Sequence, residues 1–462
     1  MKTILAKSIA VTVILGSILA ACTGPLSQQF VPAGTAVPTV APTSTISPTP
    51  APLLLGEYEL LSPDDMRHDL DELFYQIEQV HPNPYTKRPK SDADRERQGI
   101  YDELGQAMTM IDFYRKVDPL VSSLGDRHTY VLLPDDVQEQ KEKNELLFPL
   151  DVKMTGQNGL IIGNYSGNPD VPIGGKLLSI NGIPIGSISI PMTNFFPYSL
   201  WWSYGSLPEY RVEVLPEGET TPVIFDLRAI TQEEIDRNFP LVNTEELVSY
   251  RKVPDEPVGV LTVRTFIGIG PLLKPAFTKI KEENIQHLII DVRMNGGGRD
   301  ISPLMDYLTD QPYSLCSRSY KAPFGGYGTG TPRESDFCKV IEPFDTEERF
   351  QGKIYLLTGP YSFSAAIIFG NILQDYGLAT LIGEETRDTA SFCAMPSLSE
   401  LPRTKLIYEV STECFVRPSG LLDDQPLIPD IRVETTINDQ LAGKDPVLDY
   451  TLEMIQNGGQ MP

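Results

Sequence analysis

The sequence predicts a mixed α/β fold in which helices cover a parallel or mixed sheet, with one helical and one β-rich part before it. Its 462 residues are 41% hydrophobic, which is enough apolar content to fill a large core. From Gly259 onward, strands that are apolar on both faces alternate with helical patterns, as in a sheet with helices on its two faces. Residues 147–228 instead contain short β-like runs separated by turn dipeptides, which indicates a separate β-rich module.

The part before this module is predicted to be helical. Ser62 is suited to cap a helix over residues 62–81, whose apolar side chains recur on one stripe. A second helical pattern begins near Phe113 and changes to a strand pattern after His128. We therefore predict a helical cap over residues 54–146.

The rest of the folded chain divides into the β-rich module, residues 147–230, and the helix-covered sheet, residues 231–445. In the second of these, the runs "VGVLTV", "HLIIDVR", "KIYLLT" and "ATLIG" are predicted strands, and residues 271–283 and 364–376 are predicted helices. Open α/β sheets place their chemistry at the carboxyl ends of the strands, so we searched there for functional residues.

The start of the chain predicts an exported protein. Residues 1–21 have the form of a secretory signal, because lysines flank an apolar run that is too short to span a bilayer. The run ends in Leu-Ala-Ala before Cys22, a tetrad that resembles a bacterial lipobox, in which the cysteine carries a diacylglyceryl anchor. The alternative is an uncleaved signal anchor with an incidental cysteine. Residues 22–53, rich in Pro, Thr and Ser, are predicted to tether the folded part to the membrane of the cell envelope.

Charge and cysteine content exclude several classes of function. The formal charge is -24 and the basic residues form no cluster, which argues against nucleic acids and polyanionic surfaces as partners. None of the cysteines after Cys22 has C-x-x-C spacing and the chain has only 4 histidines, so we expect no metal site. Cys316–Cys338 and Cys393–Cys414 are the local disulfide pairs, and free buried thiols are the alternative.

Two motifs follow predicted strands. The run "DVRMNGGG", residues 291–298, lets the backbone approach a ligand and direct N–H groups at it, as an oxyanion hole requires, although a tight turn would read the same. After "KIYLLT", Ser362 and Ser364 stand at the start of the next helix, where free N–H groups would stabilise an adjacent oxyanion. Either serine could instead cap this helix, and the two could divide the roles.

A nucleophilic serine needs a base, and His128 is the best candidate. It lies between polar residues at a helix-to-strand junction and could project into a cleft, although an exposed turn histidine would fit the same pattern. The other histidines, His68, His81 and His287, lie within or at the ends of predicted elements, so we interpret them as structural.

Taken in order, the segments "LGDRHT", "ING", "LIIDVRMNGGG", "SAA", "IGEET" and "PLIPDI" resemble the tail-specific protease family, which includes C-terminal-processing peptidases and the tricorn protease core. The resemblance covers about residues 57–440. It implies a serine endopeptidase with a crotonase-like core and often a PDZ-like module, to which residues 149–185 are similar, although Lys176 replaces an acidic residue usual there.

The same resemblance implies the roles of the site residues. Ser364 would be the nucleophile, and backbone N–H groups of Gly297 or Gly298, together with Ala365, would bind the oxyanion. C-terminal-processing peptidases use a lysine base, but Thr389 stands at that position here. The tricorn-like branch uses serine, histidine and an acid, which implies His128 as base and Asp423 as the acid.

Two details qualify this assignment. Asp424, the neighbour of Asp423, is the alternative acid, and Ile367 stands where the family usually has glutamate. The sequence therefore predicts an exported, lipid-anchored serine peptidase without metal or organic cofactor, acting on polypeptides through an acyl-enzyme. The alternatives are an inactive relative that binds peptides or an envelope partner, and an acyl hydrolase acting on esters.

Overall fold

The computed structural model describes residues 60–134, 137, 146–155, 158–188, 196–238, 246–422, 424–436, 439 and 442–458. The predicted signal, the lipidation site Cys22, the tether and the predicted acid Asp423 therefore lie outside the described residues.

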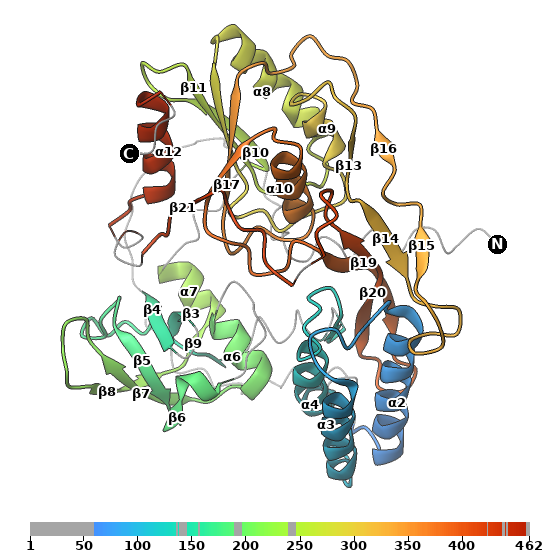
Figure 1. Cartoon of the computed structure of the whole chain (residues 1–462). Helices are drawn as coiled ribbons and strands as arrows, with labels where there is room; N and C mark the ends of the chain where they lie inside the picture. The colour runs from blue at the N-terminus through green and yellow to red at the C-terminus, as the bar shows by residue number, and fades with distance from the viewer. Residues whose placement is uncertain are drawn as a thin grey trace, which may run out of the picture. The chain divides into compact units, whose positions relative to one another are not determined.

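The described residues from 248 onward include a six-stranded sheet, which is the central sheet of this part of the chain (Figure 1). Its order is β10 (Val248–Lys252), β11 (Val258–Val263), β12 (His287–Asp291), β17 (Lys353–Thr358), β18 (Thr380–Gly383) and β21 (Ile431–Arg432). Neighbouring strands run parallel except for β10 and β11, which are antiparallel. This confirms the predicted mixed sheet and strands "VGVLTV" and "KIYLLT".

Helices cover both faces of this sheet because its strands are apolar on both faces. Leu288 and Ile290 of β12 face one cluster, which contains α8 (Gly270–Glu282), α9 (Ser302–Met305) and α10 (Ala365–Asp375). Ile289, between them, faces a second cluster with α12 (Pro446–Gln456) on the other side. Each such side chain that is fully buried stabilises the fold by about 1.5–3 kcal/mol. The apolar run of β12 is thus explained by burial on both faces.

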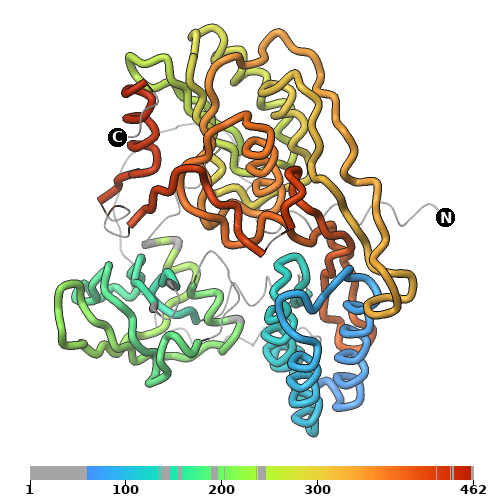
Figure 2. The backbone as a smooth tube through the Cα atoms, in the orientation of Figure 1, coloured from blue at the N-terminus to red at the C-terminus, as the bar shows by residue number. Residues whose placement is uncertain are grey.

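A second, antiparallel sheet joins the two ends of the folded chain. It contains β1 (Tyr130–Leu132), β14 (Arg318–Lys321), β15 (Arg333–Ser335), β19 (Phe392–Glu400) and β20 (Ile407–Val416). β1 pairs with β20 in the register Tyr130↔Glu409, and the N–H of Ser411 donates to the Thr129 Oγ1 at 3.0 Å. Figure 2 shows the N-terminal helices beside this C-terminal hairpin. The pairing brings His128, which precedes β1, to the C-terminal half of the chain.

Among the described residues, three helices precede β1: α2 (Pro63–Val80), α3 (Lys90–Glu103) and α4 (Met110–Ser122). As predicted, Ser62 caps α2, and its Oγ accepts from the N–H of Asp65 at 3.1 Å. The sequence did not indicate α3, because only Ala93 and Ile100 of this charged helix are buried. Among the described residues, no helix is both long and apolar enough to cross a membrane.

The predicted β-rich segment forms its own sheet. Its strands are β3 (Leu150–Thr155), β4 (Asn158–Asn164), β5 (Lys176–Ile180), β6 (Ile183–Pro184), β7 (Glu209–Leu215) and β8 (Val223–Arg228), and all their pairs are antiparallel. A separate hydrophobic cluster that includes α6 (Phe196–Tyr204) packs on it. Its likeness to PDZ modules, the helical cap and the domain boundaries stay predictions.

Short elements complete the described chain. They are β2 (Leu146–Leu147) paired with β9 (Ile230–Thr231), β13 (Tyr313–Ser314) paired with β16 (Val340–Ile341), the 3-10 turn η2 (Ile185–Ser187) and α7 (Gln232–Asn238). Disulfides join Cys316 to Cys338 and Cys393 to Cys414. This confirms the local pairing, and the free-thiol alternative is wrong.

Candidate active site

Ser364 occupies a strained turn between β17 and α10. Its backbone has φ 55° and ψ -118°, a conformation that costs a residue other than glycine on the order of 1–3 kcal/mol. Ser364 precedes the first residue of α10, but its side chain makes no capping hydrogen bond. The Oγ is therefore held at a helix N-terminus without serving as a cap.

Ser362 has the structural role that the sequence left open between the two serines. It is buried, its Oγ donates to the Val292 carbonyl at 2.9 Å, and the N–H of Gly359 donates to that Oγ at 3.1 Å. These bonds tie the turn before Ser364 to the segment that follows β12. Ser362 thus supports the turn, and Ser364 is left free for chemistry.

His128 lies beside Ser364, with its Nε2 3.1 Å from the Ser364 Oγ. The imidazole is buried and stacks on two rings, with centroid distances of 4.7 Å to Phe363 and 5.6 Å to Phe392. The His128 Nδ1 has no hydrogen-bond partner within the described part of the chain. A histidine at this distance can accept the proton of a serine hydroxyl.

The backbone of His128 is held by a half-buried carboxylate. Asp126 accepts from the His128 N–H at 3.1 Å and lies 2.9 Å from the Nε2 of His81. The N–H of Asn83 donates to the His81 Nδ1 at 3.0 Å, so the His81 Nε2 carries the hydrogen and donates it to Asp126. Burial raises the pKa of Asp126, but the hydrogen bond from His81, together with the other donors to this carboxylate, outweighs it and holds that pKa below its usual value.

The electrostatic surroundings keep the imidazole neutral. Burial lowers the pKa of His128, and the negative charges of Asp126, Asp388 and Glu409 offset this only in part. The same three charges would stabilise the imidazolium that forms when Ser364 loses its proton. A neutral base with carboxylates nearby is the arrangement that general-base catalysis requires.

The glycine run approaches Ser364 closely. A Cβ placed on Gly297 would lie 2.7 Å from the Cβ of Ser364, and one on Gly298 would lie 2.4 Å from the carbonyl carbon of Phe266. Both residues have positive φ, 101° and 146°, so only glycine fits at either position.

Only one of the two predicted glycines keeps a free donor. The Gly297 N–H donates to the Oδ1 of the fully buried Asn295 at 2.8 Å, so the prediction of Gly297 as an oxyanion donor is corrected. Neither Gly298 nor Ala365 donates its N–H to another described residue. The candidate oxyanion hole therefore consists of these two N–H groups.

With this geometry, the family can be identified. Residues 257–433 match the family model described as Peptidase family S41. The chain contains a domain of peptidase family S41. Peptidases of this family are serine-type endopeptidases. The matched segment includes Ser364 and the glycine run but not His128.

Two curated proteins are similar to part of this chain. Tricorn protease of Thermoplasma acidophilum is 24% identical over 223 residues, which cover 48% of this chain and 18% of that protein. Tail-specific protease of Haemophilus influenzae is 26% identical over 145 residues, covering 30% of this chain and 18% of that protein. The chain thus spans less than a fifth of either relative.

Among solved structures, mature CPAF has a similar fold. It superposes with a TM-score of 0.59 over 86% of this chain and 99% of that one, at 16% sequence identity. The similarity at this identity concerns the fold, and it extends well beyond the residues matched to the S41 model.

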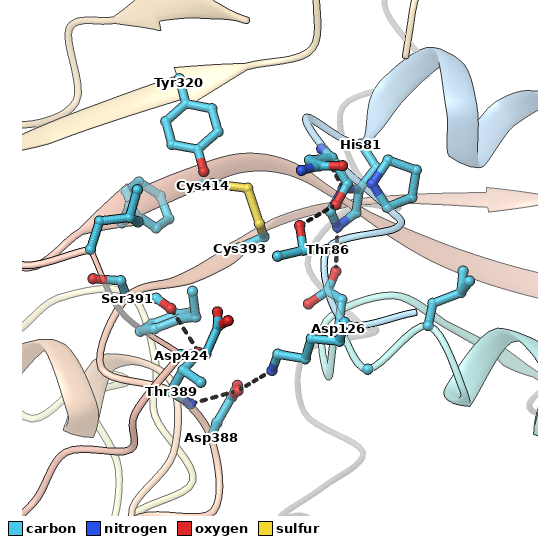
Figure 3. A pocket seen from close by; sticks show the side chains of 18 residues that line it. His81, Thr86, Asp126, Tyr320, Asp388, Thr389, Ser391, Cys393, Cys414 and Asp424 are labelled. Carbon is cyan, nitrogen blue, oxygen red and sulfur yellow. Dashed lines mark hydrogen bonds and ion pairs between the residues drawn. A yellow bond between two sulfur atoms is a disulfide. The ribbon is translucent and has the colours of Figure 1, made fainter. Parts of the chain in front are cut away.

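Part of the candidate site was not predicted from the sequence. Asp424 is exposed and lines a pocket with Asp126, Asp388 and the Cys393–Cys414 disulfide (Figure 3). Asp388 is buried, 3.6 Å from the Lys87 Nζ, and the N–H of Thr389 donates to it at 2.9 Å. Half-buried Asp126 and buried Asp388 are thus carboxylates near His128 that the sequence did not indicate.

Thr389 stands where the resemblance to C-terminal-processing peptidases implies a lysine base. It is buried, and its hydroxyl donates to the carbonyl of Ser391 at 2.7 Å. A threonine hydroxyl cannot serve as a base at neutral pH, so His128 is the candidate base. No three His, Cys, Asp or Glu side chains of the described ranges converge as metal ligands.

Proposed function

We propose that this protein is a serine endopeptidase in which Ser364 attacks the carbonyl carbon of a peptide bond. The observation that supports this most strongly is the 3.1 Å contact between the Ser364 Oγ and the His128 Nε2, two residues that are 236 positions apart in the chain. The strained backbone of Ser364 supports the same conclusion, because strain at a single polar residue is typical of a functional site.

The reaction proceeds in two halves. As the Ser364 Oγ bonds to the carbonyl carbon, its proton moves to the His128 Nε2, and the Gly298 and Ala365 N–H groups bind the oxyanion. His128 then gives the proton to the leaving amine as the C–N bond breaks, which leaves an acyl-enzyme. Water, deprotonated by His128, attacks this ester and releases the acid, and Ser364 regains its proton.

The acid of the triad is proposed from the resemblance to the tricorn-like branch. Asp423 is the first candidate and Asp424 is its alternative. Asp388, which is buried and whose charge acts on His128, is a third candidate. Replacing each aspartate by asparagine and measuring kcat will identify the acid, because loss of the triad acid lowers kcat by about 10⁴-fold.

We further propose that the peptidase is exported and anchored to the cell envelope by lipid on Cys22. The signal-like segment and the Leu-Ala-Ala-Cys tetrad support this. Growth with radiolabelled palmitate should label the wild type but not Cys22→Ala. Labelling of both proteins, or of neither, would contradict lipidation at Cys22.

Hydrolysis of an unstructured protein tests the proposed activity. Quenched-fluorescent casein should be cleaved by the purified wild type, whereas Ser364→Ala should be inactive. Cleavage that survives Ser364→Ala would come from a contaminant or another site. If no peptide is cleaved but an activated ester is, the protein is an acyl hydrolase, and if neither is cleaved, it is an inactive, peptide-binding relative.

A further inference from the structure

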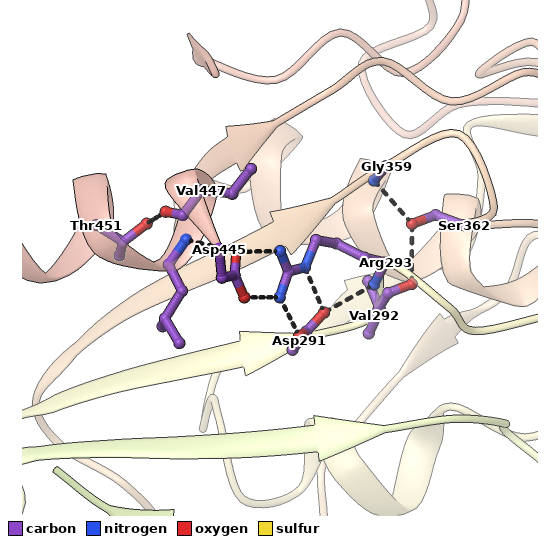
Figure 4. A network of polar contacts seen from close by, with 9 residues as sticks. Asp291, Val292, Arg293, Gly359, Ser362, Asp445, Val447 and Thr451 are labelled. Atoms are coloured by element: carbon purple, nitrogen blue, oxygen red, sulfur yellow. Dashed lines mark hydrogen bonds and ion pairs between the residues drawn. The ribbon is translucent and has the colours of Figure 1, made fainter. Parts of the chain in front are cut away.

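Arg293 connects two carboxylates that come from distant parts of the chain (Figure 4). Its Nε and Nη2 donate to the two carboxylate oxygens of Asp291 at 3.0 and 2.7 Å. Its Nη1 and Nη2 donate to the two oxygens of Asp445 at 2.6 and 2.7 Å. All three side chains are largely buried, with exposed fractions of 22%, 14% and 35%. Paired geometry of this kind is the strongest form of ion pair in proteins.

Asp445 is the N-cap of the C-terminal helix. Its Oδ1 also accepts from the N–H of Leu448 at 3.1 Å, so the carboxylate holds both the first turn of α12 and the Arg293 guanidinium. Val447 of α12 packs into the cluster on the far face of the central sheet. Asp445 lies beyond residue 433, where the match to the S41 model ends, so this link connects the S41 domain to a helix outside it.

Arg293 lies between two residues that position the nucleophile. On one side, the Val292 carbonyl accepts from the Ser362 Oγ at 2.9 Å. On the other side, the Asn295 carbonyl accepts from the N–H of Phe363 at 3.0 Å. The two residues directly before Ser364 are thus hydrogen-bonded to the carbonyls of Val292 and Asn295, which lie on either side of Arg293 in the chain.

The same segment fixes the oxyanion donors. The Asn295 N–H donates to the Val292 carbonyl at 3.0 Å, and the Asn295 Oδ1 accepts from the Gly297 N–H at 2.8 Å. Movement of the backbone at Arg293 would therefore displace Gly298 as well as the turn that carries Ser364. A displacement of about 1 Å in such a site can cost on the order of 100-fold in rate.

Removing Asp445 would leave the charge of Arg293 incompletely balanced. Burial raises the pKa of Asp445, but the hydrogen bonds and charge of Arg293 hold it below its usual value, so the pair is ionised at neutral pH. Without this partner, the guanidinium would have to turn toward water or share Asp291 alone. Either change would act on the backbone between β12 and the glycine run.

We propose that Arg293 and Asp445 are positioning residues that tie α12 to the glycine loop and so hold Gly298 and Ser364 in their catalytic arrangement. The inference rests on the proposed peptidase function, because it assigns the pair a role in the rate of that reaction. The C-terminal helix is then part of the catalytic apparatus although it contributes no group to the reaction.

The test compares Asp445→Asn with a matched ion pair away from the site. Arg417 donates to Asp375 through two nitrogens, at 3.0 and 2.6 Å, and this pair is at least as buried, at the far end of α10. In the full chain, Asp445→Asn and Arg293→Lys should lower kcat on a peptide substrate about tenfold with KM changed less than twofold. Asp375→Asn should lower Tm without lowering kcat, and Asp445→Glu, which keeps the carboxylate, should recover part of the rate.

Hydrogen exchange supplies a readout that does not depend on turnover. Asp445→Asn should accelerate amide exchange of residues 292–298 and 362–366 at least tenfold relative to wild type, whereas Asp375→Asn should not. Equal exchange in both variants, or loss of Tm with kcat unchanged in Asp445→Asn, would overturn the inference. If Asp445→Asn does not fold, kcat and amide exchange of Arg293→Lys and Asp445→Glu are compared with those of wild type and Asp375→Asn instead. A wild type without any hydrolysis would refute the proposed function, and exchange would still decide whether Asp445 holds the loop.

Discussion

The Nε2 of His128 lies 3.1 Å from the Oγ of Ser364, although the two residues are 236 positions apart in the chain. Pairing of β1 with β20 makes this contact possible, because it fixes the residues directly after His128 on the C-terminal hairpin. Phe392, the first residue of β19, then covers one face of the imidazole. The nucleophile and its base are thus joined by a sheet that contains strands from both ends of the folded chain.

Ser364 is predicted to be essential for activity although its strained backbone lowers the stability of the fold. Ser364→Ala should lower kcat by about 10⁴-fold or more, since it removes the nucleophile. Ser364→Gly should be equally inactive but about 1 kcal/mol more stable than Ser364→Ala, because glycine adopts φ 55° without strain. Urea denaturation of the two variants measures the difference, and a less stable glycine variant would show that the turn is not strained.

The pH dependence of kcat/KM should reflect the protonation of the buried His128 imidazole. Catalysis requires neutral His128, whose pKa burial lowers from 6.5, so the acidic limb of kcat/KM should lie below pH 6.5. Between the folded pKa and 6.5 the unfolded chain binds more protons, so stability should rise with pH across that window. His128→Gln should abolish the limb with the activity, while replacing half-exposed His68 by alanine should leave it in place. A limb above pH 6.5 would contradict this assignment.

The glycine run offers an internal control. Gly298→Ala should unfold the loop or lower kcat by at least about 100-fold, because the new Cβ would overlap the Phe266 backbone and shift an oxyanion donor. Gly296→Ala should be tolerated, since nothing lies within 4 Å of its Cβ position. Kinetics and thermal melts of both variants test this. Similar losses of kcat and stability in the two variants would indicate that any added side chain disturbs the loop, whichever glycine carries it.

Replacing Asp126 and replacing Asp118 by asparagine should change the free energy of unfolding in opposite directions. Asp126 has a lowered pKa, so it stabilises the fold above its unfolded pKa, and this stability is lost as pH falls through the folded value. Asp118 of α4 has its pKa raised by burial to about 6, so stability is lost as pH rises from 3.8 toward 6.

At pH 7, therefore, Asp126→Asn should destabilise the protein and lower kcat through the His128 backbone. Asp118→Asn should stabilise it, by at most about 3 kcal/mol, with kcat unchanged. Urea denaturation at pH 7 and pH 4.5, together with kcat, checks both, and a common sign would contradict the assignment.

The sequence predicted those elements whose burial shows in a local pattern. β12 and β17 are apolar on both faces because helices cover both sides of the sheet, and α2 has a capping serine and a continuous stripe. α3 has no such stripe, because it buries only two side chains. Most residues of β19 are exposed or half-buried, so no apolar run predicted the hairpin that it forms with β20.

The sequence predicted only those site residues that come directly after a strand. Ser364 and the glycine run come after β17 and β12, and the family resemblance connected them to His128. Phe392 contacts His128 only because distant segments pair, and the sequence has no periodic signal for this pairing. The contact between Asp126 and His81 likewise joins residues that are 45 positions apart. The occupied N–H of Gly297 depends on the buried side chain of Asn295, which the glycine pattern alone does not show.

The most direct test of the proposed dyad is covalent labelling of the purified full-length protein with a fluorophosphonate probe, which reacts with activated serines. The wild type should be labelled, and mass spectrometry of its peptides should place the adduct on Ser364. Ser364→Ala and His128→Ala should both remain unlabelled, whereas Ser362→Ala, if it folds, should keep the reactive serine. An unlabelled wild type, or labelling that survives Ser364→Ala, would contradict an activated Ser364.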